Sequence, residues 1–337
     1  MKKIIGIAIL ACAAATAASA APSAKPSSKP APSSKPEWAY AIPLPGQPAL
    51  PRLHDDSTPY SLPGSKLKFT RNKVQGVSDD GKKSRVPPAD WFPGEHPRMP
   101  KIVAEGDTAR KITPCAICHS PLGRGRPQNG HLAGLPADYF ATQLREMKQG
   151  LRKSAEPRKV NAREMVDFAK AMTEAEILEA AAYYAALPTT VPIKVVETAT
   201  VPKMRSQEGM WLPHEDRTRQ PIAGRVIETP ANVDREQLRD PHAGFIAYVP
   251  VGAVAKGRRM AANLGCEGCH GAGLRGGIDE TPAIAGRSPS YLARQLYDFQ
   301  QGARHGEMAA AMKEVSAKLT GADIVNLTAY TASLKAK

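Results

Sequence analysis

Residues 115–119 read Cys-Ala-Ile-Cys-His, and residues 266–270 read Cys-Glu-Gly-Cys-His. Both follow the pattern C-x-x-C-H, the attachment signal for c-type haem. On one turn of helix the two cysteines reach the two vinyl groups along one porphyrin edge, and the histidine then lies beneath the iron. We therefore expect two covalently bound haem c groups. The expected attachment residues are Cys115, Cys118 and His119 in the first motif, and Cys266, Cys269 and His270 in the second.

Two other chemistries also use paired cysteines. A structural zinc site needs four ligands, and C-x-x-C-H offers at most three locally. A thioredoxin-like pair needs no histidine and normally lies beside a strand. Of the five cysteines, only Cys12 lies outside the two motifs, so none remains for a structural disulfide. Covalent haem is the chemistry that both motifs favour.

The two motifs open two copies of an internal repeat. Tyr139 and Tyr291 stand 152 positions apart, and the motifs themselves stand 151 apart. Each tyrosine is followed at the same spacing by Gln-Leu, an apolar residue, Gly and Arg. A repeat of this length indicates two tandem domains of similar build.

Helix signals recur in both copies. We expect short helices over residues 139–150 and 291–302, each ended by glycine. A closing helix follows in each copy. Thr173 precedes Glu176 at capping-box spacing in the first copy, and Thr320 and Asp323 precede Ile324 in the second. Each domain should therefore be a small helical bundle.

The order of these elements resembles class I cytochrome c, in particular tandem two-haem periplasmic members. The resemblance rests on C-x-x-C-H, Leu/Ile-Ala-Gly, Tyr-x-x-x-Gln-Leu, Gly-x-Arg and a methionine seven residues before a Leu/Met-Thr helix start. It implies methionine as the distal iron ligand, and the repeat assigns this role to Met165 and Met312. Met308 is the main rival for the second site, and His131 and His305 are weaker rivals.

The resemblance also predicts a difference between the two sites. In this family a proline two residues before Leu/Ile-Ala-Gly orients the proximal histidine through its carbonyl group. Pro282 holds that position in the second copy, and Gly130 holds it in the first. We expect the contact to His119 to differ and the two haem potentials to be unequal.

The N-terminus carries an export signal. Lys2 and Lys3, an apolar stretch over residues 4–10 and Ala18-Ser19-Ala20 form a signal peptide. A competing interpretation is lipoprotein processing, which would leave Cys12 as a lipid anchor at the new N-terminus. Both interpretations predict an exported, periplasmic protein, either free or tethered to the membrane.

The fold class expected is mainly α, with two tandem class I cytochrome c domains, an irregular N-terminal arm and a small strand-containing segment between the domains. Short β-branched runs at 193–198, 225–229 and 245–249 predict the strands. The expected boundaries are a signal peptide at 1–20, a Pro/Ser/Lys-rich linker at 21–37, the arm at 38–96, domain 1 at 97–188, the inter-domain segment at 189–250 and domain 2 at 251–337.

The formal net charge is +14, but the 46 Lys and Arg residues are scattered, without a dense basic helix or an aromatic-interleaved run. This pattern is typical of a solvated basic surface, and nucleic acid is not an expected partner. The expected electron donor and acceptor are redox proteins, because the two motifs predict haem.

The sequence predicts an electron carrier and not an enzyme, because two six-coordinate His/Met haems leave no open iron position. The alternatives are a two-haem peroxidase with one open haem, and a cytochrome subunit of a periplasmic dehydrogenase or a membrane oxidase complex.

Overall fold

The structure is a computed structural model that describes residues 35–43, 58–189, 193–216, 218–277 and 281–336. The signal peptide, Cys12 and most of the expected linker lie outside these residues. Everything described belongs to one compact unit, Pro32–Lys337. Within the described residues no helix is long and apolar enough to cross a membrane.

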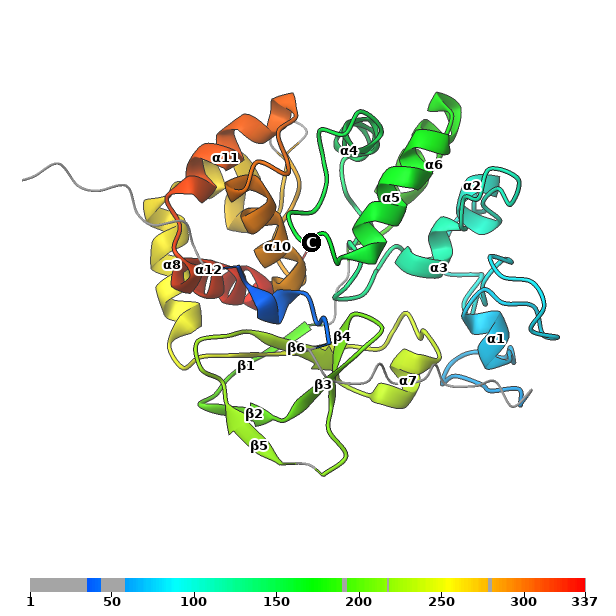
Figure 1. Cartoon of the computed structure of the whole chain (residues 1–337), viewed down its shortest axis with the longest axis horizontal. Coiled ribbons are helices and arrows are strands. Elements are labelled where there is room, and N and C mark those ends of the chain that lie inside the picture. The colour runs from blue at the N-terminus through cyan, green and yellow to red at the C-terminus, as the bar shows by residue number, and fades with distance from the viewer. Residues whose placement is uncertain (1–34, 44–57, 190–192, 217, 278–280, 337) are drawn as a thin grey trace, which may run out of the picture. The chain divides into compact units, whose positions relative to one another are not determined.

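Domain 1 consists of helices that begin and end where the sequence signals lie (Figure 1). Thr173 forms the predicted capping box with Glu176, and Gly150, at a φ of 78°, follows the last turn of the helix before it. Ile177 and Tyr184 of the closing helix are fully buried in the core of this domain. The helices are α2 (Lys101–Ala104), α3 (Cys115–His119), α4 (Ala137–Lys148), α5 (Val160–Ala171) and α6 (Glu174–Ala185).

Domain 2 repeats this arrangement with a longer first helix. Thr320 forms the second capping box, with Asp323, and Gly302 follows the helix that matches α4. Leu274 and Ile324 lie in its core. The elements are α8 (Ala253–Asn263), α9 (Glu267–His270), η2 (Ala272–Leu274), α10 (Pro289–Gln300), η3 (Glu307–Ala309), α11 (Ala310–Ala317) and α12 (Gly321–Ser333).

The inter-domain segment forms the expected small sheet. Strand β7 lies in its centre, parallel to β1 and antiparallel to β6. Two further antiparallel ribbons, β2 with β5 and β3 with β4, were not predicted from the sequence. The elements are β1 (Ile193–Glu197), β2 (Thr200–Pro202), β3 (Met204–Gln207), β4 (Met210–Pro213), β5 (Arg219–Pro221), β6 (Ile227–Pro230), α7 (Val233–Gln237) and β7 (Phe245–Val249).

The N-terminal arm is mostly irregular, as expected, and its first residues pack against domain 2. Residues 58–96 hold only α1 (Arg71–Val74) and form their own apolar cluster around Trp91. Residues 35–43, here called the strap, contain η1 (Glu37–Ala39) and bury Ala39 and Tyr40 in the core of domain 2. Buried apolar side chains decide this placement, and the Pro-rich composition of the arm gave no sign of it.

The strap is also held by two polar contacts. Lys35 Nζ lies 2.7 Å from Glu156 Oε2 of domain 1. Trp211 Nε1 of β4 donates to the Trp38 carbonyl oxygen at 2.6 Å. The last residues of the Pro/Ser/Lys-rich linker are therefore anchored to the folded protein.

Candidate haem sites

The first motif forms helix α3, and its histidine is held in one tautomer. His119 is 7% exposed, and its Nδ1 lies 2.7 Å from the carbonyl oxygen of Gly130. Because that carbonyl accepts a hydrogen bond from Nδ1–H, the Nε2 lone pair is left for iron. Burial lowers the pKa of His119, which keeps the imidazole neutral, as a metal ligand must be.

One cavity brings together the residues predicted for the first site. Cys115, Cys118, His119 and Met165 all line it, and its walls are mainly apolar. Met165 lies in the middle of α5, far from the motif in sequence, and lines the same cavity. Met147 and Met172 line the same cavity. Met172 is 4% exposed and caps the end of α5, in agreement with its predicted role as core.

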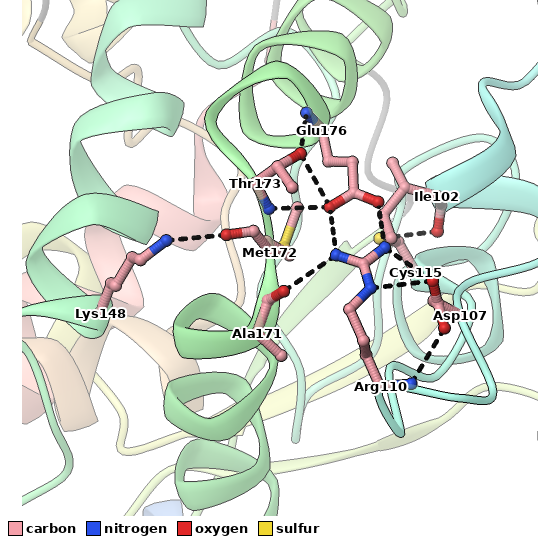
Figure 2. Close-up of polar contacts among 9 residues, drawn as sticks. All are labelled: Ile102, Asp107, Arg110, Cys115, Lys148, Ala171, Met172, Thr173 and Glu176. Atoms are coloured by element: carbon pink, nitrogen blue, oxygen red, sulfur yellow. Dashed lines mark hydrogen bonds and ion pairs between the residues drawn. The ribbon is translucent and has the colours of Figure 1, made fainter.

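Helix α5 is fixed at its C-terminal end by a polar network (Figure 2). The Arg110 guanidinium donates to the Ala171 carbonyl oxygen at 3.0 Å and to Glu176 Oε2 at 2.9 Å. It also donates from Nε to Asp107 at 2.8 Å. Lys148 Nζ donates to the Met172 carbonyl oxygen at 2.8 Å. These bonds tie α5 to α4, α6 and the segment before α3, and so hold the helix that carries Met165.

The second motif repeats the histidine geometry. His270 is 8% exposed, and its Nδ1 lies 2.9 Å from the Pro282 carbonyl oxygen. Met312 lies half-buried on α11, whereas its rival Met308 lies in η3 and is 52% exposed. The His305 side chain is exposed, and its Nδ1 lies 3.0 Å from the Gly302 carbonyl oxygen.

The expected difference in the contact to the proximal histidine is wrong. Gly130 and Pro282 both present a backbone carbonyl to Nδ1, at 2.7 Å and 2.9 Å. The contact survives the exchange of side chains because only the carbonyl group takes part. His131, the rival ligand beside Gly130, does not line the cavity that holds Met165; it lines a second cavity behind α3.

The chemistry of the thiols argues against zinc and against a reactive cysteine. Burial raises the pKa of Cys115 to about 12 and also raises the pKa values of Cys118 and Cys266. Zinc binding and nucleophilic attack both need the thiolate. Throughout the described residues, no group of three or more His, Cys, Asp or Glu side chains is arranged to hold a metal ion.

A symmetric polar cluster joins the two domains at the edge of the first cavity. Arg152 donates to Gln143 Oε1 at 2.8 Å and to Tyr291 at 3.0 Å. Arg304 donates to Gln295 Oε1 at 3.0 Å and to Gln143 Oε1 at 2.6 Å. The cluster pairs equivalent repeat positions: Tyr139 with Tyr291, Gln143 with Gln295, and Arg152 with Arg304.

The cluster places positive charge in a buried position. Arg152 is 8% and Arg304 is 5% exposed, and the hydrogen bonds named above go to uncharged oxygens. The buried carboxyl group of Asp298, which lines the same cavity, interacts with both arginines. Because a buried cation is costly without a counter-charge, the two carboxylates of a porphyrin edge would add a favourable partner here, and the mainly apolar wall suits the ring. The first cavity therefore suits a covalently attached haem.

Comparison with known proteins agrees with this geometry. The sequence model of the family described as cytochrome c matches residues 103–187 and 254–335. Both segments belong to the cytochrome c family. The resemblance predicted from the sequence is therefore confirmed, as are haem iron, electron transport and the two-domain repeat.

Two curated proteins are similar to this chain over most of their own length. It is 26% identical to a thiosulfate dehydrogenase electron acceptor from Thiomonas intermedia, over 62% of this chain and 72% of that protein. It is 25% identical to cytochrome c4 from Azotobacter vinelandii, over 68% of this chain and 90% of that one.

Two solved structures are also similar to this chain. A thiosulfate dehydrogenase from Marichromatium purpuratum matches 69% of the chain at 27% identity with a TM-score of 0.45, and the cytochrome spans only 39% of that structure. Reduced cytochrome c4 from Pseudomonas stutzeri matches 67% of this chain and 97% of its own, at 22% identity and a TM-score of 0.42.

Sequence reasoning found the motifs but missed the role of the inter-domain cluster. Its glutamines and arginines were visible as conserved spacing within the repeat, Gln-Leu and Gly-x-Arg. The recurrence of the same polar residues in both copies could have marked them as candidates for a contact between the domains. Their meeting across the domain boundary needed the folded chain.

Proposed function

We propose that this protein is a periplasmic two-haem electron carrier in which His119 and Met165 ligate one iron, and His270 and Met312 ligate the other. Cys115, Cys118, Cys266 and Cys269 would form the four thioether bonds. The observation that carries the proposal is the single cavity lined by both cysteines of the first motif, His119 and Met165.

The side chains and carbonyl groups around each site would set the potential of a bound iron. A bound haem supplies an iron that cycles between the ferric and ferrous states. The Gly130 and Pro282 carbonyls fix the imidazole rings and increase their basicity. A methionine thioether is a soft, weak donor that favours ferrous iron and raises the potential. With a histidine and a methionine both held for each iron, each site would exchange electrons without binding a substrate.

The proposed assignment of methionines is tested by spectroscopy. Ferric iron with His/Met ligation gives a weak methionine–iron charge-transfer band at the red end of the visible spectrum. Met165→Ala and Met312→Ala should each remove about half of this band. Met308→Ala, at the exposed neighbouring methionine, is the matched control and should keep all of it. Retention of the full band in Met165→Ala or Met312→Ala would refute that assignment.

The same spectra test the peroxidase alternative. A peroxidase needs one haem with an open distal position, which gives a high-spin ferric signal. We expect the wild-type protein to be low-spin at both sites. A high-spin signal that is lost when a small ligand such as cyanide is added would overturn the carrier proposal.

One relative favours a more specific role. The relative from Thiomonas intermedia is named as a thiosulfate dehydrogenase electron acceptor. This name supports the proposal that the present protein receives electrons from a periplasmic dehydrogenase. Near the second motif, Cys269 is exposed, and α8 presents Lys256, Arg258 and Arg259 to solvent. A basic surface beside a haem suits an acidic partner. Reduction by thiosulfate with a purified thiosulfate dehydrogenase should be fast at low salt and slow at high salt; no reduction would exclude this donor.

A further inference from the structure

The loop that orients the first proximal histidine lacks the stiffness of its counterpart. In domain 2 the His270 acceptor is the carbonyl of Pro282, whose ring fixes φ. In domain 1 the acceptor belongs to Gly130, the most flexible residue type. Both distances are nevertheless short, at 2.9 Å and 2.7 Å. Within domain 1, Asn129 Nδ2 donates to the Cys118 carbonyl oxygen at 3.0 Å, and the Leu132 amide donates to the Gly123 carbonyl oxygen at 2.8 Å. Further hydrogen bonds to the same loop come from the other domain.

Domain 2 supplies that support from two arginines. Arg287 donates from Nη1 to the His131 carbonyl oxygen at 2.8 Å and from Nη2 to the Ala133 carbonyl oxygen at 3.4 Å. Arg294 donates from Nη2 to the Pro127 carbonyl oxygen at 2.7 Å. The two arginines thus donate hydrogen bonds to the loop on both sides of Gly130.

A tyrosine of the same helix closes the arrangement. A Cβ atom placed on Gly130 would lie 3.4 Å from Cε2 of Tyr291, so the ring of Tyr291 packs directly on the glycine. A distance of 3.4 Å is ordinary van der Waals contact, so α10 lies directly against the loop at Gly130.

The two arginines are buried cations, and their described hydrogen bonds go to backbone carbonyls. Each is 4% exposed. Arg287 also donates to the Ala283 carbonyl oxygen, and Arg294 to that of Ala39 in the strap. Charge-assisted hydrogen bonds of this kind are roughly twice as strong as neutral ones. They hold the loop rigidly and place positive charge behind the first haem site.

Among the described residues, these repeat positions support the histidine loop of domain 1 but not that of domain 2. At the repeat spacing of 152, Leu135 matches Arg287 and Thr142 matches Arg294. Leucine has no donor, and the threonine hydroxyl is too short to reach across a domain boundary as arginine does. Domain 1 therefore has no equivalent pair to offer the Pro282 loop, which its proline already stiffens.

We propose that Arg287 and Arg294 of domain 2 are positioning residues for the first haem site, and that they raise the potential of that haem by fixing the His119 acceptor loop and by their charge. This inference rests on the proposed haem function and names the residues through which one domain tunes the other. Positive charge near the iron favours the ferrous state, so its removal should lower the first potential and leave the second unchanged.

The test uses the full-length protein carrying both haems. Arg287→Gln removes the charge and Arg287→Lys keeps it. The control, Arg275→Gln, alters an exposed arginine that donates to the Lys335 carbonyl oxygen within domain 2. The two potentials are measured by redox titration followed by electron paramagnetic resonance, and the first site is identified by the signal that Met165→Ala changes. Hydrogen exchange of the amides at 127–133 reports the loop itself.

In Arg287→Gln we expect the equilibrium constant for reduction of the first haem to fall about tenfold, which lowers its potential by about 59 mV for one electron. Exchange at 127–133 should quicken, and Arg287→Lys should recover most of the potential. The control should behave as wild type. An unchanged first potential in both variants, or an equal shift of both haems, would overturn the inference. Failure of the proposed function would show separately, as wild-type protein without two covalent haems.

Discussion

Gly257 lies where α8 crosses α12, and its replacement by alanine should destabilise domain 2. A Cβ atom on Gly257 would lie 2.0 Å from the Asn326 carbonyl oxygen and 2.7 Å from Tyr330 Cβ. The first obstacle is the backbone of another helix, which cannot rotate away as a flexible side chain can. The two helices must separate to admit the methyl group.

The size of the effect follows from two opposing terms. Alanine in a helix interior is about 1 kcal/mol more favourable than glycine. Overpacking a close-packed core typically costs about 1–3 kcal/mol, and a contact with rigid backbone belongs at the upper end. The net loss should be about 1–2 kcal/mol. For a folded unit of this size the Tm falls by about 2–4 °C per kcal/mol, so we expect a fall of several degrees.

Thermal unfolding followed by circular dichroism checks this result. Gly94→Ala is the matched control, because nothing lies within 4 Å of its Cβ position and its φ is not positive. The control should keep the wild-type Tm or gain up to about 1 kcal/mol through the unfolded chain. A Tm for Gly257→Ala at or above that of wild type would show that the helices do not meet as closely as described.

Three further predictions concern the supports of the two sites. The Arg110 guanidinium lowers the pKa of Glu176 to about 2 from an ordinary value near 4.3. Its stabilising effect is therefore complete above pH ~4.3 and is lost as the pH falls toward 2, and Glu176→Gln should flatten the curve of Tm against pH in that window. Thr173→Ala and Thr320→Ala should each lower the free energy of unfolding by about 1 kcal/mol, measured by denaturant unfolding, because the capping boxes of α6 and α12 are lost. Stability equal to that of wild type would show that these caps do not stabilise the fold. Trp211→Phe should cost about 1 kcal/mol by removing the hydrogen bond to the strap, and should increase proteolysis near residues 35–43; unchanged cleavage would contradict the anchoring.

Much of the fold could be read from local signals. The capping boxes at Thr173 and Thr320 and the glycines after α4 and α10 gave the helix ends, because each depends on residues within one or two turns. The β-branched runs gave the three strands of the sheet. The ribbons β2–β5 and β3–β4 were missed because their strands are only three or four residues long, which is too short for an alternating pattern to stand out in the sequence.

The placement of the N-terminal arm was beyond sequence reasoning. Ala39 and Tyr40 enter the core of domain 2, more than two hundred residues away in the chain. No local pattern marks the partner of a buried side chain. The expected difference at Gly130 failed for a related reason, because the acceptor is a carbonyl group that every residue type possesses.

The sequence by itself determined the cytochrome c family of the two segments, the repeat and the ends of the helices, and it predicted covalent haem. These follow from residue types at fixed short spacing, and the repeat offset carried the prediction of Met165 and Met312 from one copy to the other. Only the tertiary structure decided which side chains meet across the domain boundary. The arginines of domain 2 that grip the Gly130 loop lie more than 150 residues from it, and such contacts depend on packing and buried charge, which no local spacing encodes.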